Sequence, residues 1–365
     1  MTLSSGGTRL QVPANANQFN FPDKLNDGAS YNVTIASQPL GFSTFCDLSN
    51  GAGVVKSANI SNITIACRPA SVVVTTLAGS GATASTDGQG LAAGFNRPVA
   101  VATDASGNVY VADSQNFMVR KITPAGVVST LARGISSPQG LVVDSANNVY
   151  VGNGIDVRKI SATGEVSVVA GGTAIAFADG TGSAARFGGA QGIALDAAGN
   201  IYVADYFNHR IRKITPTGVV TTFAGSGQIG FTDGTGTAAT FGYPGGLAMG
   251  PEGDIYVIEA SSKVRKISPA SVVSTFVDLG SVPSSPDSVA VDQAGNLYVA
   301  FKNEIRLITP KGAMSTLAGK TSQGNENGIG AAASFAYPRG LALDSSGNLY
   351  VADTGNQLVR KLSSH

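Results

Sequence analysis

The feature that most constrains this chain is a sixfold internal repeat. The phrase NLYVAD at residues 348–353 returns five more times in altered form, each time with a tyrosine at its centre. A period of this length, built from short alternating apolar runs between Gly, Asn and Asp, is typical of a four-stranded propeller blade rather than a helical repeat. The repeat therefore predicts an all-β chain with a six-bladed β-propeller over residues 71–365. The repeated tyrosines lie 40 to 54 residues apart and are Tyr110, Tyr150, Tyr202, Tyr256, Tyr298 and Tyr350.

Each repeat can be divided into four expected strands. In the last repeat, strands a, b and c fall at 340–344, 348–353 and 357–362, and the pattern of a fourth strand is seen at 127–131 and 219–223 of earlier repeats. The last repeat ends without its fourth strand, whereas a matching segment stands at 72–78, before the first repeat. We expect this segment to complete the last blade, because closing the ring with both chain ends removes exposed sheet edges.

Residues 1–69 lack the blade phrase and form a separate expected domain. Their alternating stretches at 31–36 and 60–66 predict half-buried antiparallel strands, and hence a small Ig-like or fibronectin-like β-sandwich. The chain's two cysteines, Cys46 and Cys67, both lie here. We predict that they form a disulfide, which would add roughly 3 kcal/mol to a marginal core. Two buried free thiols are the alternative.

Two resemblances to known families follow from these motifs. The segment DYFNHRIRK at 205–213 resembles the Asn-His-Leu signature of NHL-repeat β-propellers, and the likeness extends over 71–365. Four residues depart from the pattern but leave the tyrosine and the apolar positions intact, so those blades are still expected to fold. Asn153, Glu259 and Phe301 replace the strand-b Asp, and Gly250 replaces the Asp that closes strand a.

The first domain resembles modules of exported bacterial surface proteins and lipoproteins over most of its length, in particular residues 28–67. This resemblance implies a location outside the cytoplasm, whether periplasmic, cell-surface or secreted. The turn-rich start after Met1 further suggests that an export signal was removed.

Charge and hydropathy argue against nucleic-acid binding and against a membrane-spanning segment. The chain has 24 basic and 23 acidic residues and a formal charge of +1, so it lacks the strong positive field that nucleic-acid binding requires. No apolar run approaches the roughly 20 residues that a membrane span needs.

An arginine recurs at one place on strand c of every repeat. Because a ligand site rarely needs six equivalents, we interpret this ring as structural, with ion pairs to strand-b acids such as Asp113, Asp205 and Asp353. The six are Arg120, Arg158, Arg212, Arg265, Arg306 and Arg360.

Turns between strands b and c, and connections from strand d to the next strand a, must share one rim of the ring. The connections into blades 1, 3, 4 and 6 are long (79–97, 171–190, 225–243 and 319–337), and those into blades 2 and 5 are short. We therefore expect four raised loops to flank a trough through the centre, with its ends at 153–156 and 301–304. Its central ring would come from the strand-a starts Val99, Gln139, Gln191, Gly245, Asp287 and Arg339.

Aromatic and amide side chains on this rim suit recognition of a sugar or a peptide, although any of them could pack against a loop instead. Tyr206, Phe207, His209 and Phe117 stand on b-to-c turns. The candidate ligand-binding residues are Asn153, Tyr206, Phe207, His209, Asp287, Phe301 and Arg339.

The long connections share a second phrase, DGTG at 179–182, with counterparts starting at Asp87, Asp233 and, altered, Glu326. Its oxygen ligands make calcium possible, but one carboxylate per loop favours a plain turn, and no cofactor is predicted. The phenylalanines after this phrase are expected to anchor the loops to the ring; they are Phe95, Phe187, Phe241 and Phe335.

The main functional hypothesis is an exported, non-catalytic recognition or scaffold protein that binds a protein, peptide or carbohydrate. The alternative is a metal-dependent lyase or lactonase with Asp287 on the axis, because six-bladed relatives include such enzymes. The chain has only two histidines, His209 and His365, which excludes a zinc site with three imidazoles. It also lacks a Gly-x-Ser-x-Gly elbow.

Overall fold

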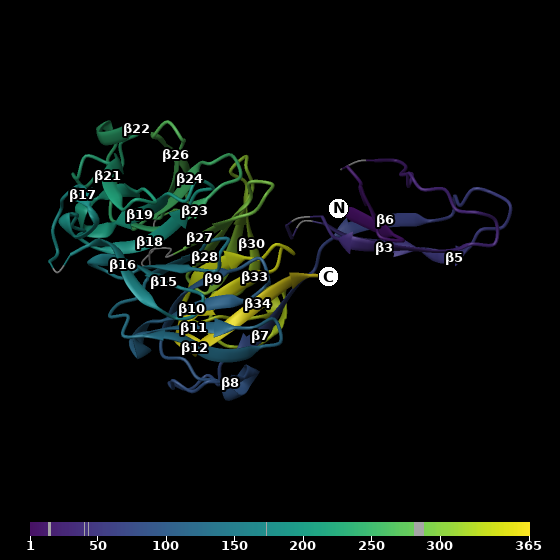
Figure 1. Cartoon of the computed structure of the whole chain (residues 1–365), viewed down its shortest axis with the longest axis horizontal. Helices are drawn as coiled ribbons and strands as arrows, with labels where there is room; N and C mark the ends of the chain where they lie inside the picture. The colour runs from purple at the N-terminus through teal and green to yellow at the C-terminus, as the bar shows by residue number, and fades with distance from the viewer. Residues whose placement is uncertain (14–15, 40, 43, 173, 281–287) are drawn as a thin grey trace. The chain divides into compact units, whose positions relative to one another are not determined.

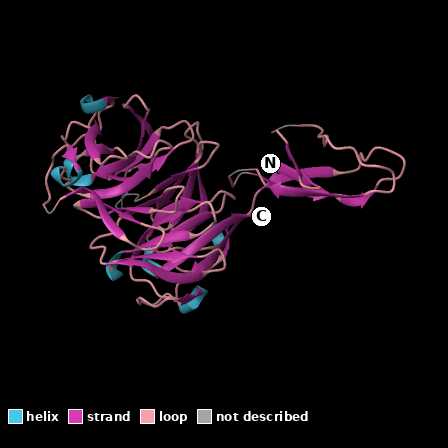
Figure 2. Cartoon of the chain, viewed as in Figure 1, coloured by secondary structure: helices cyan, strands magenta, loops and turns pink. Residues whose placement is uncertain are grey.

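The computed structural model describes the chain except for residues 14–15, 40, 43, 173 and 281–287. Asp287, one of the expected axial residues, therefore lies outside the described residues. The chain forms two compact units, Met1–Val72 with Ser363–His365, and Val73–Leu362. Strands dominate both units (Figure 2). None of the described residues belongs to a helix that is long and apolar enough to cross a bilayer.

The described residues of the first unit form two antiparallel sheets. Strands β1 (Thr2–Ser5), β2 (Thr8–Gln11), β3 (Ser30–Ser37) and β5 (Ala52–Val54) form one sheet in the order β2-β1-β3-β5. Strands β4 (Thr44–Ser49) and β6 (Thr64–Pro69) form the other. The strand expected at 60–66 begins only at Thr64, and just before it the Asn62 carbonyl accepts a hydrogen bond from the Asn50 side chain. Leu3, Val12 and Val33 are the buried centre of a small core.

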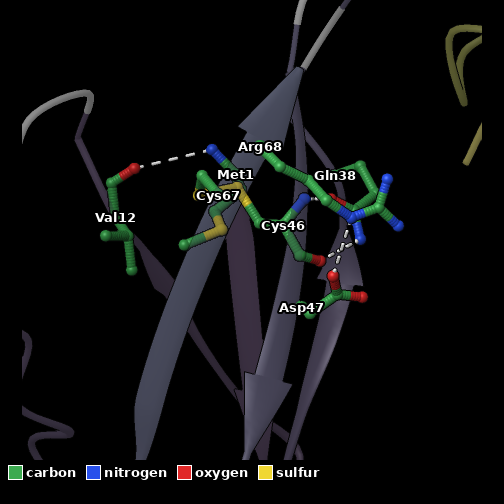
Figure 3. The surroundings of a disulfide bond; sticks show 7 residues. All are labelled: Met1, Val12, Gln38, Cys46, Asp47, Cys67 and Arg68. Carbon is green, nitrogen blue, oxygen red and sulfur yellow. Dashed lines mark hydrogen bonds and ion pairs between the residues drawn. A yellow bond between two sulfur atoms is a disulfide. The ribbon is translucent and has the colours of Figure 1, made fainter. Parts of the chain in front are cut away.

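The predicted disulfide between Cys46 and Cys67 is confirmed (Figure 3). The two residues are direct partners across β4 and β6, with Cα atoms 4.0 Å apart. The Gln38 side chain braces the bridge, since its amide both donates to and accepts from the Cys46 backbone at 2.8 Å. The bridge thus links two strands whose own sheet has no third member among the described residues.

The second unit contains six antiparallel sheets within the described ranges, each corresponding to one sequence repeat (Figure 1). We name them blades 1 to 6 and give their strands from the innermost outward. Blade 1 comprises β9 (Pro98–Thr103), β10 (Val109–Asp113), β11 (Met118–Ile122), β12 (Val127–Arg133) and β8 (Gly88–Gln89). Blade 2 comprises β13 (Gly140–Val143), β14 (Val149–Gly152), β15 (Asp156–Ile160) and β16 (Val166–Gly171). Blade 3 comprises β18 (Ala190–Leu195), β19 (Ile201–Asp205), β20 (Arg210–Ile214), β21 (Val219–Ala224) and β17 (Gly180–Thr181).

The remaining three blades repeat this arrangement. Blade 4 comprises β23 (Pro244–Met249), β24 (Ile255–Glu259), β25 (Lys263–Ile267), β26 (Val272–Asp278) and β22 (Gly234–Thr235). Blade 5 comprises β27 (Val289–Val291), β28 (Leu297–Phe301), β29 (Glu304–Ile308) and β30 (Met314–Gly319). Blade 6 comprises β32 (Pro338–Leu343), β33 (Leu349–Asp353), β34 (Leu358–Ser364), β7 (Val72–Ala78) and β31 (Gly328–Ile329). Short 3-10 turns occur at Gly90–Ala92, Ser114–Asn116, Gly182–Ala184, Tyr206–Asn208, Gly236–Ala238, Gly330–Ala332 and Thr354–Asn356.

The innermost strands form a closed ring. Each packs beside that of the next blade, in the order β9, β13, β18, β23, β27 and β32, and β32 packs against β9. Blade 3 therefore lies opposite blade 6, and blade 4 opposite blade 1. Strand β7, from the start of the chain, lies beside β34 in the sheet of blade 6. The blade that ends the chain thus takes its fourth strand from residues that precede every other blade.

A local hydrogen-bond cluster explains why the blade phrase repeats. In blade 1, Oδ1 of Asp104 accepts from the backbone amides of Ser106 and Asn108 at 2.9 Å. Its Oδ2 accepts from the Asn108 side chain at 2.7 Å and from the Tyr110 hydroxyl at 3.0 Å. The same cluster recurs around Asp144, Asp196, Asp292 and Asp344. The Asp, Asn and Tyr of each repeat are thus one structural unit that closes the turn between strands a and b.

Blade 4 replaces this cluster with an ion pair. Gly250 stands where the other blades have the accepting Asp, and Asp254 stands where they have Asn. Asp254 instead pairs with Lys266, 2.7 Å away, and Lys266 also lies over the ring of Tyr256. This substitution explains how the departure at Gly250 is tolerated.

The buried arginines of strand c have the structural role expected of them in four blades. Arg120 has no exposed side-chain surface and donates to Asp113 at 3.0 Å and to Asp87 at 2.6 Å. It also donates to the carbonyls of Gly94 and Thr86 at 2.9 and 2.8 Å. The strand-c arginine therefore fastens the preceding connection to its blade. Arg212, Arg265 and Arg360 make matching contacts.

Blades 2 and 5 lack both the long connection and the buried arginine. Arg158 pairs with Asp156 at 3.1 Å and Arg306 lies 3.9 Å from the centre of the Phe301 ring, and both arginines remain partly exposed. The six strand-c arginines therefore do not all make the same contacts.

Part of each long connection leaves the rim of the ring. Each runs down the outer edge of its blade, where residues of its DGTG phrase or its counterpart pair with the outermost strand, as β8 does with β12. Gly90 then donates to the carbonyl of Gly126 in the turn between strands c and d. The anchoring phenylalanines are fully buried, as predicted. These segments therefore pack along the outer edges of their blades, and the trough between raised loops stays a prediction.

Candidate ligand-binding site on the propeller axis

A cavity of about 170 Å³ lies at the centre of the ring and is bordered by all six innermost strands. The structure brings together five of the six strand-a starts identified from the sequence, and only Asp287 falls outside the described residues. Gln191 directs its side-chain oxygen toward Gly245, whose missing side chain keeps this part of the cavity open. The five bordering residues are Val99, Gln139, Gln191, Gly245 and Arg339.

A second cavity of about 130 Å³ adjoins the first between blades 1 and 2. Val99, Gln139 and Arg339 border both cavities. Seven of the nine side chains around the second cavity are polar, and none of these described residues is acidic. The rest of its border is formed by Arg97, Ser114, Gln115, Phe117, Ser136 and Ser137.

Aromatic side chains border the axial cavity on the opposite side. Tyr206, from the b-to-c turn of blade 3, and Tyr243, from the start of blade 4, both line it. Their ring centres are 5.2 Å apart, and Phe207 packs edge-on against Tyr206 at 4.9 Å. Phe207 does not border the cavity but is 58% exposed beside it. Two tyrosine rings on blades 3 and 4 therefore lie across the axis from the arginines of blades 6 and 1.

His209 positions one of these tyrosines and is itself buried. Its Nδ1 accepts a hydrogen bond from the Tyr243 backbone at 3.3 Å, and its ring meets the Tyr243 ring edge-on at 4.6 Å. Burial, and then the nearby charge of Arg210, lower the pKa of His209, so the imidazole is neutral and able to accept at pH 7. The structure thus places His209 behind the site rather than on its surface.

Asn153 and Phe301 are also buried away from the cavity. The Asn153 side chain donates to Asp156 at 2.7 Å and accepts from the Ser137 backbone at 2.8 Å. The Phe301 side chain is 2% exposed and packs in the core between blades 4 and 5. Neither side chain offers surface to a ligand in this arrangement.

Glu259 is the one acidic residue that borders the axial cavity within the described ranges. Its side chain has no exposed surface and pairs with Arg265 at 3.3 Å. Burial raises the pKa of this carboxyl to about 7, while the Gly242 amide and Arg265 act in the opposite direction. Glu259 therefore has the position of a structural acid, equivalent to Asp113 in blade 1, with an unusually high affinity for a proton.

The rim differs in polarity between its two halves. The connections on either side of blade 3 carry Ile175, Phe177, Ile229 and Phe231, all well exposed. We call these four residues and Phe207 the apolar half-rim. The equivalent positions beside blade 6 are Thr83, Ser85, Gln323 and Asn325, which are exposed and polar. Tyrosines and apolar loops thus share one side of the ring, and arginines and polar loops share the other.

The carboxylates of the DGTG phrase are engaged by arginine. Asp179 lies 2.6 Å from Arg212, and Asp233 lies 2.7 Å from Arg265. Within the described residues no group of three or more His, Cys, Asp or Glu side chains is arranged to hold a metal ion.

Sequence reasoning missed Tyr243 and Arg97. Both adopt left-handed backbone conformations, with φ of 54° and 56°, immediately before a proline. The residue before a proline normally stays extended, so nothing in the local sequence indicates this turn. Alignment of the repeats could have identified these positions, because Tyr337 and Gly189 also stand immediately before the innermost strands β32 and β18.

Comparison with known proteins agrees with this architecture. Residues 187–214 and 335–362 match the family model described as NHL repeat. NHL repeat-containing protein 2 of Bos taurus is 30% identical over 183 residues, which are 48% of this chain and 21% of that protein. Teneurin-1 of Homo sapiens is 26% identical over 381 residues, which cover 86% of this chain. The chain thus spans only 14% to 21% of the length of these relatives.

Solved structures show the same fold at low identity. A structural genomics protein of unknown function from Bacteroides thetaiotaomicron has a TM-score of 0.66 at 18% identity, over 94% of this chain and 84% of its own. An auxiliary nutrient binding protein from Bacteroides ovatus has a TM-score of 0.64 at 13% identity, over 93% and 95%. A gluconolactonase from Xanthomonas campestris has a TM-score of 0.57 at 16% identity, over 80% and 89%. This chain therefore has an NHL-repeat β-propeller-type fold.

Proposed function

We propose that this protein is an exported, non-catalytic recognition protein that binds a glycan or peptide in the axial cavity of its propeller. The observation that carries the proposal is the combination of two tyrosines, two glutamine amides and one arginine around one open cavity. Stacking surfaces and hydrogen-bonding groups are combined there, whereas the one bordering acid of the described residues is sealed against Arg265. The fold likeness to an auxiliary nutrient binding protein is consistent with a binding role.

The location outside the cytoplasm and the Ig-like nature of the first unit belong to the same proposal. A disulfide between Cys46 and Cys67 is favoured by oxidising compartments. Two antiparallel sheets in the first unit are consistent with a small sandwich. The two Bacteroides structures match 94% and 93% of this chain, which is more than residues 73–362 alone. Their similarity therefore includes part of the first unit.

The proposed site can be tested by filling it. A side chain at Gly245 would start 3.8 Å from the Ile258 carbonyl and 4.0 Å from Gln191, which are ordinary contacts, and would project beside the cavity. We expect Gly245→Leu to abolish binding in glycan and peptide arrays while the protein still folds. Tyr206→Ala should weaken the same interaction at least tenfold. Val219→Ala, on the outermost main strand of blade 3, is the matched control.

Two outcomes would contradict this placement. One is unchanged affinity in both Gly245→Leu and Tyr206→Ala, which would move the site elsewhere. The other is that folded wild-type protein binds no member of either array, which would refute the recognition role itself.

A lyase or lactonase remains the second candidate function because a gluconolactonase shares the fold and because Glu259 borders the cavity with a raised pKa. A carboxyl of this kind can exchange a proton near neutral pH. Hydrolysis of lactones by wild-type protein with added calcium, and its loss in Glu259→Gln, would favour this candidate over the first.

A further inference from the structure

We propose that the outer edge of blade 2 binds an extended segment of another protein, in which an acidic residue is followed by a small residue and then by a basic one. The segment would add to strand β16 as a fifth strand of the blade. This surface belongs to the outermost strand, whereas the axial cavity is bordered by the innermost strands. The inference therefore does not depend on the proposed function.

Four other blades show what covers such an edge. In blades 1, 3, 4 and 6 a two-residue strand from the preceding connection pairs antiparallel with the outermost main strand, as β8 does with β12. Blade 2 has no fifth strand among the described residues, because the connection that precedes it, 134–139, is short. The connection into blade 5 is also short, but it includes residues outside the described ranges, so we restrict the inference to blade 2.

The missing cover leaves apolar side chains of β16 exposed. Val128 of blade 1, which pairs with Gly88 of the covering strand, is 1% exposed. Val166 has the same position in blade 2 but is 41% exposed, and Val168, on the same face of the strand, is 55% exposed. None of the residues of β16 is a lysine or a proline, which commonly protect an exposed edge. An apolar edge of this kind can accept another strand.

The backbone of β16 presents hydrogen-bonding groups at two positions. Residues of an antiparallel pair alternate between those that bond to the partner strand and those that face away from it. The Ser161 amide donates to the Glu165 carbonyl at 2.8 Å, which fixes the phase of this alternation. Ser167 therefore turns its backbone groups toward β15, whereas the N–H and C=O groups of Val166 and Val168 face outward. Their spacing suits an antiparallel strand added to the edge.

A carboxylate is the expected partner for one end of this edge. In blade 3, Asp179 accepts from Arg212 at 2.6 Å and from the backbone amide of Thr222 at 3.3 Å. Arg158 and Val168 hold these two positions in blade 2 and are direct partners across β15 and β16. The hydroxyl donor of Thr222 has no counterpart at Val168. Blade 2 thus keeps a guanidinium and an outward amide at the positions that bind a carboxylate in blade 3.

Arg158 retains donors for such a carboxylate. Its Nε and Nη2 donate to Asp156, and its Nη1 donates to the Gly134 carbonyl. Each terminal nitrogen of a guanidinium carries two N–H groups, so within the described ranges one N–H remains on each of them. The Arg158 side chain is also partly exposed, whereas Arg212 is fully buried and serves two carboxylates. Arg158 can therefore take a second carboxylate without releasing Asp156.

Glu165 specifies the other end of the segment. In blade 3, Gly180 and Thr181 of the covering strand pair with Val220 and Val219 in turn. Glu165 stands at the position of Val219 in blade 2 and is exposed. A basic residue at the position of Thr181 would lie opposite this carboxylate, and opposite charges stabilise a cross-strand pair. Glycine occupies the middle position in all four covering strands, so the order is acid, small residue, base.

The binding test uses peptides based on the chain's own covering segment. Residues 176–184 have the sequence AFADGTGSA, and lysine in place of Thr181 gives the probe AFADGKGSA. The control peptide AFAKGDGSA exchanges the two charges at identical composition. Both are labelled with fluorescein, blocked at the C-terminus and titrated with the full chain by anisotropy. We expect the probe to bind at least roughly fivefold more tightly than the control peptide.

Hydrogen exchange then locates the bound probe. Exchange at residues 166–168 should slow when the probe is bound, because the outward amides of β16 gain hydrogen-bond partners. Residues 220–222 have the same positions in blade 3, where the edge is already paired, so their exchange should not change.

Two variants test the contacts. Arg158→Gln should weaken binding of the probe at least roughly fivefold. Val166→Pro removes an outward amide without taking a hydrogen bond from β15, so it should abolish binding in protein whose circular dichroism is unchanged. The matched controls are Ser167→Ala, on the same strand, and Lys311→Gln, which removes a positive charge from an exposed turn of blade 5. Neither control should change the affinity.

Four results would overturn the inference. They are equal binding of probe and control peptide, slowed exchange only outside blade 2, unchanged affinity in both Arg158→Gln and Val166→Pro, and no binding to folded wild-type protein. Self-association that protects residues 166–168 without peptide, seen by sedimentation at increasing concentration, would assign the edge to a second copy of the chain and would equally refute a partner segment. Gly245→Leu separates this edge from the axial cavity, because probe binding should persist when the cavity is filled.

Discussion

Replacing Arg120 by methionine should destabilise the propeller much more than the same change at Arg158, although both occupy the same repeat position. The Arg120 side chain is 0% exposed and holds the fully buried carboxylate of Asp113, whereas Arg158 is 23% exposed. Removing Arg120 leaves Asp113 with two hydrogen bonds, from the Asn96 amide and the Asn116 side chain, but without a cation. Breaking a buried pair in this way costs about 3–5 kcal/mol. Breaking the Arg158 pair should cost less, because water reaches its guanidinium and Asp156 also accepts from the Asn153 side chain.

Urea unfolding at pH 7 measures this difference. The chain has ten tyrosines and no tryptophan, and the repeated tyrosines lie in the blades, so tyrosine fluorescence follows the propeller. We expect Arg120→Met to lower its free energy of unfolding by about 3–5 kcal/mol and Arg158→Met to lower it by clearly less.

A double variant provides the internal check. Asp113→Asn in the Arg120→Met background should recover a substantial part of the loss, because an amide can remain buried without a cation. Burial raises the pKa of Asp113, and the same burial is what makes its unpaired charge costly. Equal losses in Arg120→Met and Arg158→Met, or no recovery in the double variant, would refute the reasoning.

Three further predictions concern other contacts. Because the folded state holds the Glu259 proton more tightly than the unfolded state, stability should fall by on the order of 1–3 kcal/mol between pH 4.5 and 7, and urea titrations of Glu259→Gln should lack this decline. His209→Gln should leave the thermal midpoint nearly unchanged, since Gln357 already serves as the equivalent acceptor for the Arg97 amide; a large loss on calorimetry would indicate another role for the imidazole. Replacing Cys46 and Cys67 by serine should destabilise the first unit by roughly 3 kcal/mol, seen as faster hydrogen exchange there, with unchanged exchange in the blades.

The sequence predicted those parts of the fold that depend on short-range contacts. The Asp, Asn and Tyr of each blade lie four to six residues apart, so their hydrogen-bond cluster leaves a repeated phrase. The strand-c arginines were predictable for the same reason, because their strand-b partners are close in sequence. Repetition at a fixed spacing therefore identified both the blades and their internal ion pairs.

The paths of the long connections were not predictable in this way. They depend on the space between neighbouring blades, which no single repeat encodes. The axial cavity was partly anticipated through Gln139, Gln191 and Arg339. Tyr243 reaches the axial cavity, and Arg97 the adjoining one, through left-handed turns before proline. Asn153, His209 and Phe301 were expected at the surface because the residue type at their repeat positions differs between blades. All three are buried, so the differences reflect different packing within each blade.

The placement of β7 in blade 6 has a consequence for the order of folding. This strand is synthesised before any other strand of the ring, yet its neighbour β34 is the last strand of the ring to be made, and Thr75 bonds to the Lys361 carbonyl 286 residues away. Blades 1 to 5 can form from contiguous stretches of chain, but blade 6 cannot be completed until residues 358–364 have been made. Contacts so distant in sequence form slowly. Until then β7 and the edges of the unfinished ring remain unpaired, so the interval before closure is when this chain is most exposed to aggregation and to proteases.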